Sequence, residues 1–278
     1  MVSANGVDFS VLEWGPSSGP LALLLHGFPD TAHTWRHLGP ALAEAGWHAV
    51  APFMRGYAPT GPAPDGRYQT GALAADAVAL HEALGGDSRA VVVGHDWGAT
   101  AAYGAAVYAP ERWARVVTIA VPPAPALAGA FLSYDQLRLS WYMFFFQHPL
   151  AEAVASMGDL AFVERLWRDW SPGYDCAEDM AHVREALGSS ECLAAALGYY
   201  RATIGGVGVD PALEPFQTAA GGVPEQPLLY LHGRTDGCMR LETAEAWPGT
   251  TLVDGAGHFL HLEKPDEVNR LILDFVSS

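Results

Sequence analysis

The chain has 278 residues, half of them hydrophobic, which is enough to bury a large core in one α/β domain or in a core with an inserted lid. Its 31 acidic residues outnumber 15 lysines and arginines, so the formal net charge is −16. This balance argues against nucleic acid or an anionic membrane as a partner and suits an enzyme that acts on a neutral substrate.

Strands and helices alternate through the first part of the chain. Residues 73–84 carry apolar side chains at helical spacing, and two glycines at 85 and 86 end that predicted helix. Apolar runs predict the strands, which we expect at 7–13 (an edge strand), 21–25, 47–53, 90–93 and 116–121. Such alternation predicts a parallel, doubly wound sheet in the α/β class.

The alternation stops at a proline-rich stretch, residues 122–125. From there to about Phe216 the sequence favours helices, and then strands are expected again at 227–232 and 251–253, followed by a helix at 265–276. The simplest arrangement is a helical cap, 122–216, inserted between two parts of one core, 1–121 and 217–278. Glycine-rich stretches at 205–208 and 219–222 would return the chain to the core.

The most informative motif follows the strand at 90–93. Gly94-His95-Asp96-Trp97-Gly98 lies between that strand and a predicted helix from Ala99, which is the context of a nucleophile elbow. The glycines allow a tight turn, so the central side chain projects alone. Because that residue is Asp96 instead of serine, the enzyme would form an ester by attack at an sp3 carbon. This disfavours a serine esterase or lipase.

An ester of Asp96 would need a base that activates water for its hydrolysis. In this fold the acid and the histidine follow the nucleophile in chain order. Asp236 follows the strand at 227–232, and His258 follows the strand at 251–253, so we expect them to be the acid and the base. The competing residues are Asp254 and Glu242 for the acid and His261 for the base.

Backbone N–H groups would stabilise the oxyanion formed during hydrolysis. One donor is expected after the nucleophile, at Trp97, and the other in the loop after an early strand, at Phe28. His26, in the same loop, is expected to brace that loop and not to act on the substrate.

Taken together, these motifs resemble the epoxide hydrolases of the α/β-hydrolase fold, and the likeness covers nearly the whole chain. Two positions depart from that pattern, Met54 before Arg-Gly and Ala58 after Tyr57, and neither is catalytic. The matching segments are His26-Gly27-Phe28-Pro29, Trp35-Arg36, Arg55-Gly56-Tyr57, Gly94-His95-Asp96-Trp97-Gly98 and Gly257-His258-Phe259.

The resemblance implies two cap tyrosines that hydrogen-bond the epoxide oxygen. Tyr142 begins a segment with a matching Phe-Gln-x-Pro end, and Tyr200 precedes an arginine near the end of the cap. A protonated phenol suits the role, because the alkoxide is a poor leaving group and needs a proton donor. Trp141 and Tyr199 are neighbours that a shift of one residue would place in these roles.

The expected activity is therefore cofactor-independent opening of an epoxide to a vicinal diol. A haloalkane dehalogenase would use the same nucleophile, with Trp97 and Trp141 or Trp167 as halide donors, although Phe28 stands where many such enzymes have asparagine. A fluoroacetate-type dehalogenase is less favoured, because Trp97 replaces an arginine. The remaining alternative, a catalytically silent binding protein, is disfavoured by the complete triad.

Other features bear on cofactors, substrate and location. The histidines show no metal-ligand spacing, so no metal is expected. The cysteines Cys176, Cys192 and Cys238 show no pairing, so we expect three free thiols. Free thiols, with no secretion leader or membrane span expected, indicate a location in the cytoplasm. The cap is rich in aromatic side chains, which suggests a small apolar or aromatic epoxide as substrate. These side chains are Trp141, Phe144, Phe145, Phe146 and Trp167.

Overall fold

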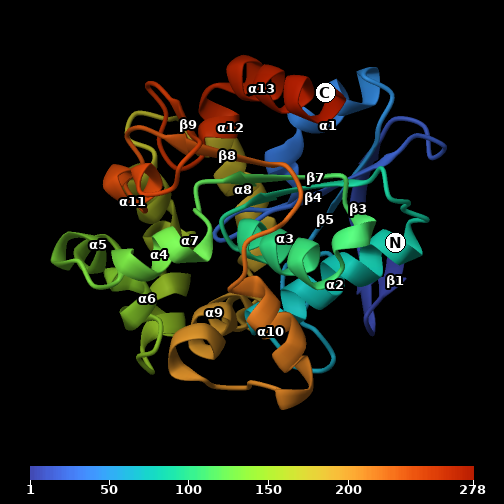
Figure 1. Ribbon diagram of the computed structural model, residues 1–278. Coiled ribbons are helices and arrows are strands. Elements are labelled where there is room, and N and C mark those ends of the chain that lie inside the picture. Colours follow the sequence, from blue (N-terminus) through green and yellow to red (C-terminus); the bar gives the residue numbers. More distant parts are fainter.

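A seven-stranded sheet organises the chain, and the computed structural model describes all 278 residues (Figure 1). The strand order is β3-β5-β4-β6-β7-β8-β9. Edge strand β3 is antiparallel to β5, and every other neighbouring pair is parallel. The strands are β3 (Val11–Trp14), β4 (Leu21–Leu25), β5 (His48–Pro52), β6 (Val91–His95), β7 (Arg115–Ile119), β8 (Leu228–Gly233) and β9 (Thr250–Val253).

Helices cover both faces of this sheet, as the continuous apolar strands require. Alternate side chains of β4 enter two separate hydrophobic clusters, Leu21 and Leu23 in one and Ala22 and Leu24 in the other. The first cluster contains residues of the helices between β7 and β8, together with α2 (Thr70–Ala83) and α3 (Trp97–Tyr108), against which α10 (Glu214–Ala220) packs. The second contains residues of α1 (Leu38–Glu44), α12 (Leu260–Glu263) and α13 (Pro265–Ser277) (Figure 1).

Only helices and loops lie between β7 and β8, in the segment where the sequence predicts a cap. The long helix α7 is kinked, because Met157 to Leu160 depart from helical dihedral angles. At the other end, α10 straddles the predicted boundary at 216 and 217 and packs on α2 and α3. The helices of this segment are α4 (Ala124–Ala130), α5 (Tyr134–Leu139), α6 (Trp141–Phe145), α7 (Ala151–Trp170), α8 (Ala177–Leu187), α9 (Ser190–Gly205), the 3-10 turn Pro211–Leu213 and α10.

The N-terminal region differs from the prediction. The strand expected at 7–13 is two strands, β2 (Val7–Phe9) and β3, and an unpredicted strand β1 (Val2–Ala4) pairs with β2. Between β1 and β2, Asn5 and Gly6 both have positive φ, 48° and 72°, as a tight hairpin turn requires. The Asn-Gly pair is a hairpin signal that the sequence reading did not use.

A buried charge network fastens the loop after β5 to α2. The guanidinium of Arg55 is fully buried and donates through Nε and Nη2 to the carboxylate of Asp76, both at 2.6 Å. Its backbone carbonyl accepts the hydroxyl of Tyr199, on α9, at 2.6 Å. The Arg-Gly-Tyr motif at 55–57 therefore joins the core to a helix of the predicted cap.

No helix of the structure combines the length and the apolar character that crossing a bilayer needs.

Candidate active site

Asp96 occupies a sharp turn between β6 and α3. Its φ is 53° and its ψ is −118°, a strained backbone for a residue with a side chain. The close approach of the chain there requires glycine at both sides. A Cβ on Gly94 would lie 2.1 Å from the carbonyl oxygen of Gly98, and one on Gly98 would lie 2.0 Å from that of Leu25. This is the elbow geometry that the sequence predicts, with the carboxylate presented at the top of the sheet.

The structure brings Asp236 and His258 to this carboxylate. Nδ1 of His258 lies 3.0 Å from Oδ2 of Asp236, and its Nε2 lies 3.7 Å from Oδ2 of Asp96. The other oxygen of Asp236, Oδ1, accepts the backbone N–H groups of Cys238 and Met239 at 2.7 and 2.9 Å. The acid is thus fixed by two backbone donors and in turn orients the imidazole.

The charges of this trio set its proton affinities. Burial lowers the pKa of His258, but the carboxylates of Asp236 and Asp96 outweigh it, and the net pKa is raised. Burial likewise raises the pKa of Asp236, yet the imidazolium and the backbone donors hold it below its ordinary value. The pair is therefore an ionised acid beside a protonatable base.

The competing residues lie elsewhere. Asp254 and Glu242 are exposed and pair with Arg234 and Arg240, respectively. His261 is buried, but its Nε2 lies 2.5 Å from Oγ1 of Thr34. None of the three lines the cavity that contains Asp96.

The loop after β4 supplies a backbone donor to one oxygen of Asp96. The N–H of Phe28 donates to Oδ1 of Asp96 at 2.7 Å. A Cβ built on Gly27 would lie 2.3 Å from that oxygen and 2.6 Å from the amide nitrogen of Trp97, so both atoms lie against this glycine. His26 accepts the N–H of Met54 on its Nε2 at 3.0 Å, a contact that braces the loop.

Two tyrosines face Asp96 from the helical segment. Tyr142 on α6 and Tyr200 on α9 line the same cavity as Asp96 and His258, and the centroids of the two tyrosine rings are 5.6 Å apart. The hydroxyl of Tyr142 lies 3.4 Å from Sγ of Cys238, whereas that of Tyr200 has no hydrogen-bond partner. Burial raises the pKa of both phenols well above the ordinary value, so both keep their protons at neutral pH.

The Gln-x-Pro end of the first tyrosine segment has a structural role. Nε2 of Gln147 donates to the carbonyl of Met143 at 2.9 Å and to that of Tyr200 at 3.1 Å. This side chain therefore ties the two tyrosine-bearing helices together.

The neighbouring aromatic residues do not take the places of these tyrosines. Trp141 is 48% exposed and lies outside the cavity lining. The hydroxyl of Tyr199 donates to the carbonyl of Arg55, away from Asp96. The structure therefore distinguishes Tyr142 and Tyr200 from the residues beside them.

The cavity around Asp96 is mostly apolar, and sequence reasoning did not find most of its wall. A strand end, α4 and the loop after β8 supply side chains that carry no catalytic motif. Besides the residues already placed, the lining consists of Thr100, Val121, Leu127, Phe131, Ser140, Met143, Cys238 and Met239. Of these, only Cys238 and Met239 had a usable signal, their closeness in sequence to Asp236.

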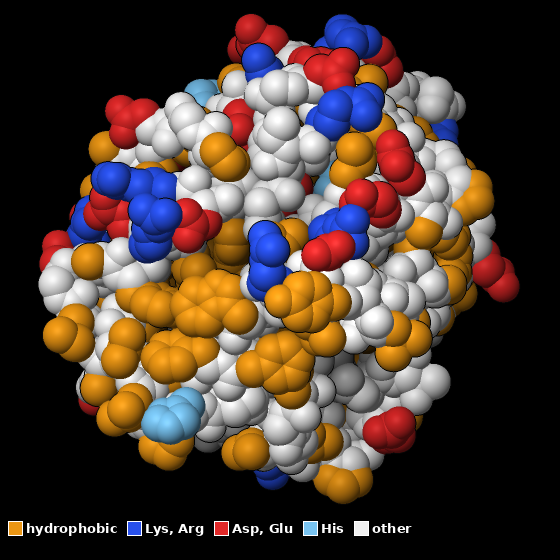
Figure 2. Space-filling view, turned by 90° about the vertical axis from the view of Figure 1, so that its left-hand side faces the viewer, with side chains coloured by type: hydrophobic (Ala, Val, Ile, Leu, Met, Phe, Trp, Pro, Cys, Tyr) orange, Lys and Arg blue, Asp and Glu red, His pale blue; other side chains and the backbone are white.

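The aromatic residues from which the sequence suggested an apolar substrate lie outside this cavity. Trp141 and Phe144 are each 48% exposed, and Phe146 is fully buried. Trp167 stacks on Phe259, with ring centroids 3.4 Å apart. Figure 2 shows hydrophobic side chains gathered on the outer face of this part of the molecule. The apolar lining of the site thus comes from other residues than expected.

The end of α7 contacts both triad loops, which the sequence did not indicate. The carbonyl of Trp170 accepts the N–H of Gly237 and that of His258, each at 3.0 Å. The next residue, Ser171, accepts the N–H of Phe259 at 3.0 Å and donates to Glu263 at 2.7 Å. One helix of the predicted cap is therefore hydrogen-bonded to the loops that carry the acid and the base.

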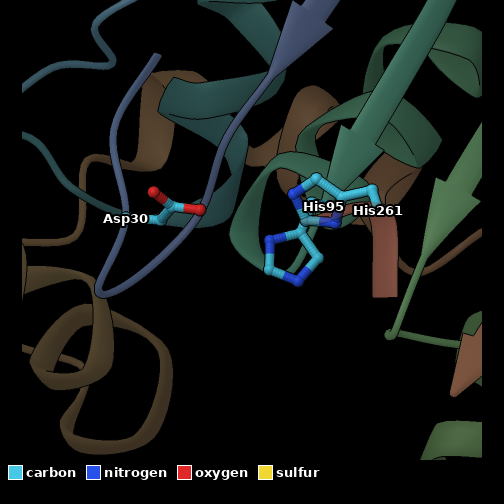
Figure 3. Close-up of side chains that lie close together, drawn as sticks. All are labelled: Asp30, His95 and His261. Carbon is cyan, nitrogen blue, oxygen red and sulfur yellow. The ribbon is translucent and has the colours of Figure 1, made fainter. Parts of the chain in front are cut away.

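Asp30, His95 and His261 form a buried group behind the triad (Figure 3). One potential ligand atom of each lies within 4.8 Å of the others, although spacing in the sequence did not indicate it. Nε2 of His95 lies 3.0 Å from the carbonyl of His258. Burial raises the pKa of Asp30 to about 8 and lowers the pKa of both histidines, so the group is largely uncharged at neutral pH. The expectation of a metal-free enzyme stays a prediction.

The cysteines are as expected. Cys176, Cys192 and Cys238 are all free and buried.

Comparisons with known proteins agree with the geometry. Residues 20–265 match the family model described as the alpha/beta hydrolase fold. The chain is 32% identical over 318 residues to "Epoxide hydrolase A" of Mycobacterium tuberculosis, covering 100% of this chain and 96% of that protein. Among solved structures it is similar to Epoxide Hydrolase A from Mycobacterium thermoresistibile, with a TM-score of 0.77, 29% identity and coverage of 100% and 97%. It is also similar to an epoxide hydrolase from Bacillus megaterium in complex with an inhibitor, with a TM-score of 0.80, 25% identity and coverage of 100% and 99%.

Proposed function

The chain belongs to the epoxide hydrolases of the α/β-hydrolase fold, and we propose that it opens a small apolar epoxide to a vicinal diol through a covalent ester of Asp96. Water is the second substrate, and no metal or cofactor is required. The observation that carries this proposal is the asymmetric setting of the Asp96 carboxylate. Oδ1 accepts the N–H of Phe28, while Oδ2 is the oxygen nearer to His258.

Ring opening follows from this arrangement. Oδ2 of Asp96 attacks an oxirane carbon and the C–O bond breaks, while Tyr142 and Tyr200 hydrogen-bond the departing oxygen and supply a proton. The fully buried phenols are neutral donors, which suits a leaving group that needs protonation. The product of this step is an alkyl ester of Asp96 whose carbonyl oxygen is Oδ1.

Ester hydrolysis uses the other half of the site. His258, held by Asp236 through Nδ1, takes a proton from water on Nε2, and the hydroxide attacks the ester carbonyl. The amides of Phe28 and Trp97 stabilise the oxyanion that develops on Oδ1. The bond between Cγ of Asp96 and the ester oxygen then breaks, and the leaving oxygen takes the remaining proton of the attacking hydroxyl. Release of the diol leaves Asp96 as a carboxylate that contains one oxygen from water.

The donors in the cavity favour an epoxide over a haloalkane. A halide leaves unprotonated and needs N–H donors, but Trp141 lies outside the cavity and Nε1 of Trp167 donates to the carbonyl of Pro29 at 2.9 Å. Trp97 keeps a free Nε1, so one candidate halide donor remains. Two phenol hydroxyls beside the nucleophile match the chemistry of an oxirane oxygen better.

A single-turnover experiment in 18O-labelled water tests the ester. With enzyme in excess over styrene oxide, the first diol should contain no label, and the peptide that carries Asp96 should gain one 18O atom, because water attacks the ester carbonyl. Mass spectrometry of both products gives the answer. Labelled diol with unlabelled Asp96 would mean direct attack by water and would refute the proposal.

Two further assays separate the alternatives. A haloalkane dehalogenase would release chloride from 1-chlorobutane and would leave styrene oxide unchanged. A silent binding protein would form neither diol nor a covalent ester with any of a range of epoxides. Diol formation without halide release is the expected result.

A further inference from the structure

The hydroxyl of Tyr142 has one hydrogen-bond partner in the protein, Sγ of Cys238, at 3.4 Å. Cys238 lies in the loop between β8 and α11 (Leu241–Glu245) and is 5% exposed. Its N–H donates to Asp236 at 2.7 Å, and its carbonyl accepts Nε2 of Gln136 at 2.9 Å. Because the backbone is held on both sides, the thiol has a fixed position beside the phenol.

The chemistry of the two groups indicates which of them donates. Phenol oxygen is a stronger hydrogen-bond acceptor than thiol sulfur, and an oxirane oxygen is a stronger acceptor than sulfur as well. Burial raises the pKa of Cys238 well above its ordinary value, so the thiol keeps its proton. With an epoxide bound, the O–H of Tyr142 is therefore directed at the substrate, and its oxygen is free to accept the S–H.

Building on the proposed function, we propose that Cys238 is a positioning residue for ring opening. Its S–H donates to the hydroxyl oxygen of Tyr142, directs the phenol proton toward the oxirane oxygen and stabilises the phenolate left after proton transfer. Such a bond strengthens the phenol as a donor, because accepting one hydrogen bond polarises the O–H that makes the next.

The proton balance of this step closes without any other reactant. The bond from Oδ2 of Asp96 to the oxirane carbon forms as the ring C–O bond breaks. The electron pair of the broken bond stays on the ring oxygen, which also takes the proton of Tyr142. Cys238 keeps its proton throughout. Later, His258 takes a proton from the attacking water and releases it to solvent, from which Tyr142 is reprotonated.

Tyr200 provides an internal control. Its hydroxyl lines the same cavity but makes no hydrogen bond to Cys238, so removal of the thiol should act through Tyr142 alone. A double-mutant cycle can therefore distinguish positioning from a general change in packing.

The kinetic test measures the rate of ester formation by stopped-flow tryptophan fluorescence with styrene oxide. Cys238→Ala should slow ester formation roughly 2- to 10-fold, the effect of one lost hydrogen bond, and Cys238→Ser should restore most of the rate. Added to Tyr142→Phe, Cys238→Ala should have no further effect, whereas added to Tyr200→Phe it should retain its full effect. Equal effects in both backgrounds, or none in the wild type, would overturn the proposal.

A second test needs no turnover. In the Asp96→Asn background, which can bind styrene oxide but cannot form the ester, the infrared S–H stretching band of Cys238 is isolated as a difference spectrum against Cys238→Ala. With styrene oxide bound, this band should move to higher frequency in Tyr142→Phe and stay in place in Tyr200→Phe. A band that Tyr142→Phe leaves unmoved would contradict the hydrogen bond. If the protein proved to hydrolyse no epoxide, the band would still report on the contact, so failure of the proposed function and failure of this inference are distinguishable.

Discussion

Oδ1 of Asp96 accepts the backbone N–H of Phe28 at 2.7 Å, so one carboxylate oxygen already lies in the proposed oxyanion site. The other oxygen is the one nearer to Nε2 of His258, at 3.7 Å. The two oxygens are therefore distinguished by their surroundings before any substrate binds. In the proposed mechanism, Oδ2 becomes the ester oxygen and Oδ1 its carbonyl oxygen.

Gly27→Ala should abolish most of the activity. A Cβ at this position would lie 2.3 Å from Oδ1 of Asp96 and 2.6 Å from the amide nitrogen of Trp97, so the nucleophile or the amides must move. Loss of one such donor typically lowers kcat about 100-fold or more, and steady-state diol formation measures it. The matched control is Gly129→Ala, at an exposed site on α4 with open space around the added methyl, which should keep full activity. Equal activity of the two variants would contradict the crowding at Asp96.

The pKa of His258 should fall when Asp96 loses its charge. In the wild type, burial lowers this pKa, while the carboxylates of Asp236 and Asp96 raise it more. Asp96→Asn removes one of the two anions, as esterification would, so the imidazole should deprotonate at lower pH and become available as a base. NMR titration of labelled histidines in the wild type and the variant measures the change.

A control for this titration is Asp254→Asn. The Asp254 side chain is 82% exposed and pairs with Arg234, so the pKa of His258 should not move. An unchanged or raised pKa of His258 in Asp96→Asn would disprove the electrostatic coupling.

Asp30 should make the protein less stable as pH rises. Burial raises its pKa to about 8 in the folded state, against about 3.9 in an unfolded chain, so the folded protein binds more protons between these values. Stability from this group is therefore lost as pH rises from about 4 to 8. Asp30→Asn removes the titration, so the free energy of unfolding of the variant minus that of the wild type should be larger at pH 8 than at pH 5. Urea unfolding at both pH values tests this, and an equal difference at both would refute it.

Breaking the Arg55–Asp76 pair should strongly destabilise the fold. Arg55 is fully buried and Asp76 nearly so, and removal of one partner of such a buried pair costs about 3–5 kcal/mol. Without the charge of Asp76, the guanidinium of Arg55 keeps only the partly exposed carboxylate of Asp65, at 3.1 Å, as an anionic partner. Asp76→Asn should accordingly lower the urea midpoint. Asp87→Asn, which breaks an exposed pair with Arg89, should leave it unchanged. Similar midpoints for both variants would contradict this role.

Replacing the cavity tyrosines should slow ester formation, and replacing their neighbours should not. Tyr200→Phe removes a buried hydroxyl that faces the cavity, and we expect a decrease on the order of 10-fold or more in the alkylation rate. Tyr199→Phe removes a hydroxyl bonded to the carbonyl of Arg55, so it should lower stability while the alkylation rate is retained. Stopped-flow kinetics measures the alkylation rate of these two variants and of Tyr142→Phe and Trp141→Phe. A larger decrease in Tyr199→Phe or Trp141→Phe than in the cavity variants would refute the assignment.

Apolar periodicity was enough to predict the sheet, because buried parallel strands are continuous apolar runs. The strand at 21–25 has the predicted bounds, and those around the elbow differ by one or two residues. The N-terminal hairpin was missed because β1 and β2 have three residues each, too few for alternation to be read. Only the Asn-Gly turn between them was a usable signal.

The site was predictable where chain order determines position and unpredictable where packing does. Asp96, Asp236 and His258 each follow a strand, and strand ends meet at one edge of the sheet. Phe131 and Met239 line the cavity through packing of the helical segment on the core, which no motif encodes. The exposed rings of Trp141 and Phe144 illustrate the same limit, because composition does not say which way a side chain faces.

The carbonyl of Trp170 gives the active site an anchor outside the sheet. It holds the N–H of Gly237 and the N–H of His258, so any shift at this end of α7 would pull on the acid loop and the base loop together. The helical segment therefore cannot lift away as a rigid lid without disturbing the charge pair beneath it.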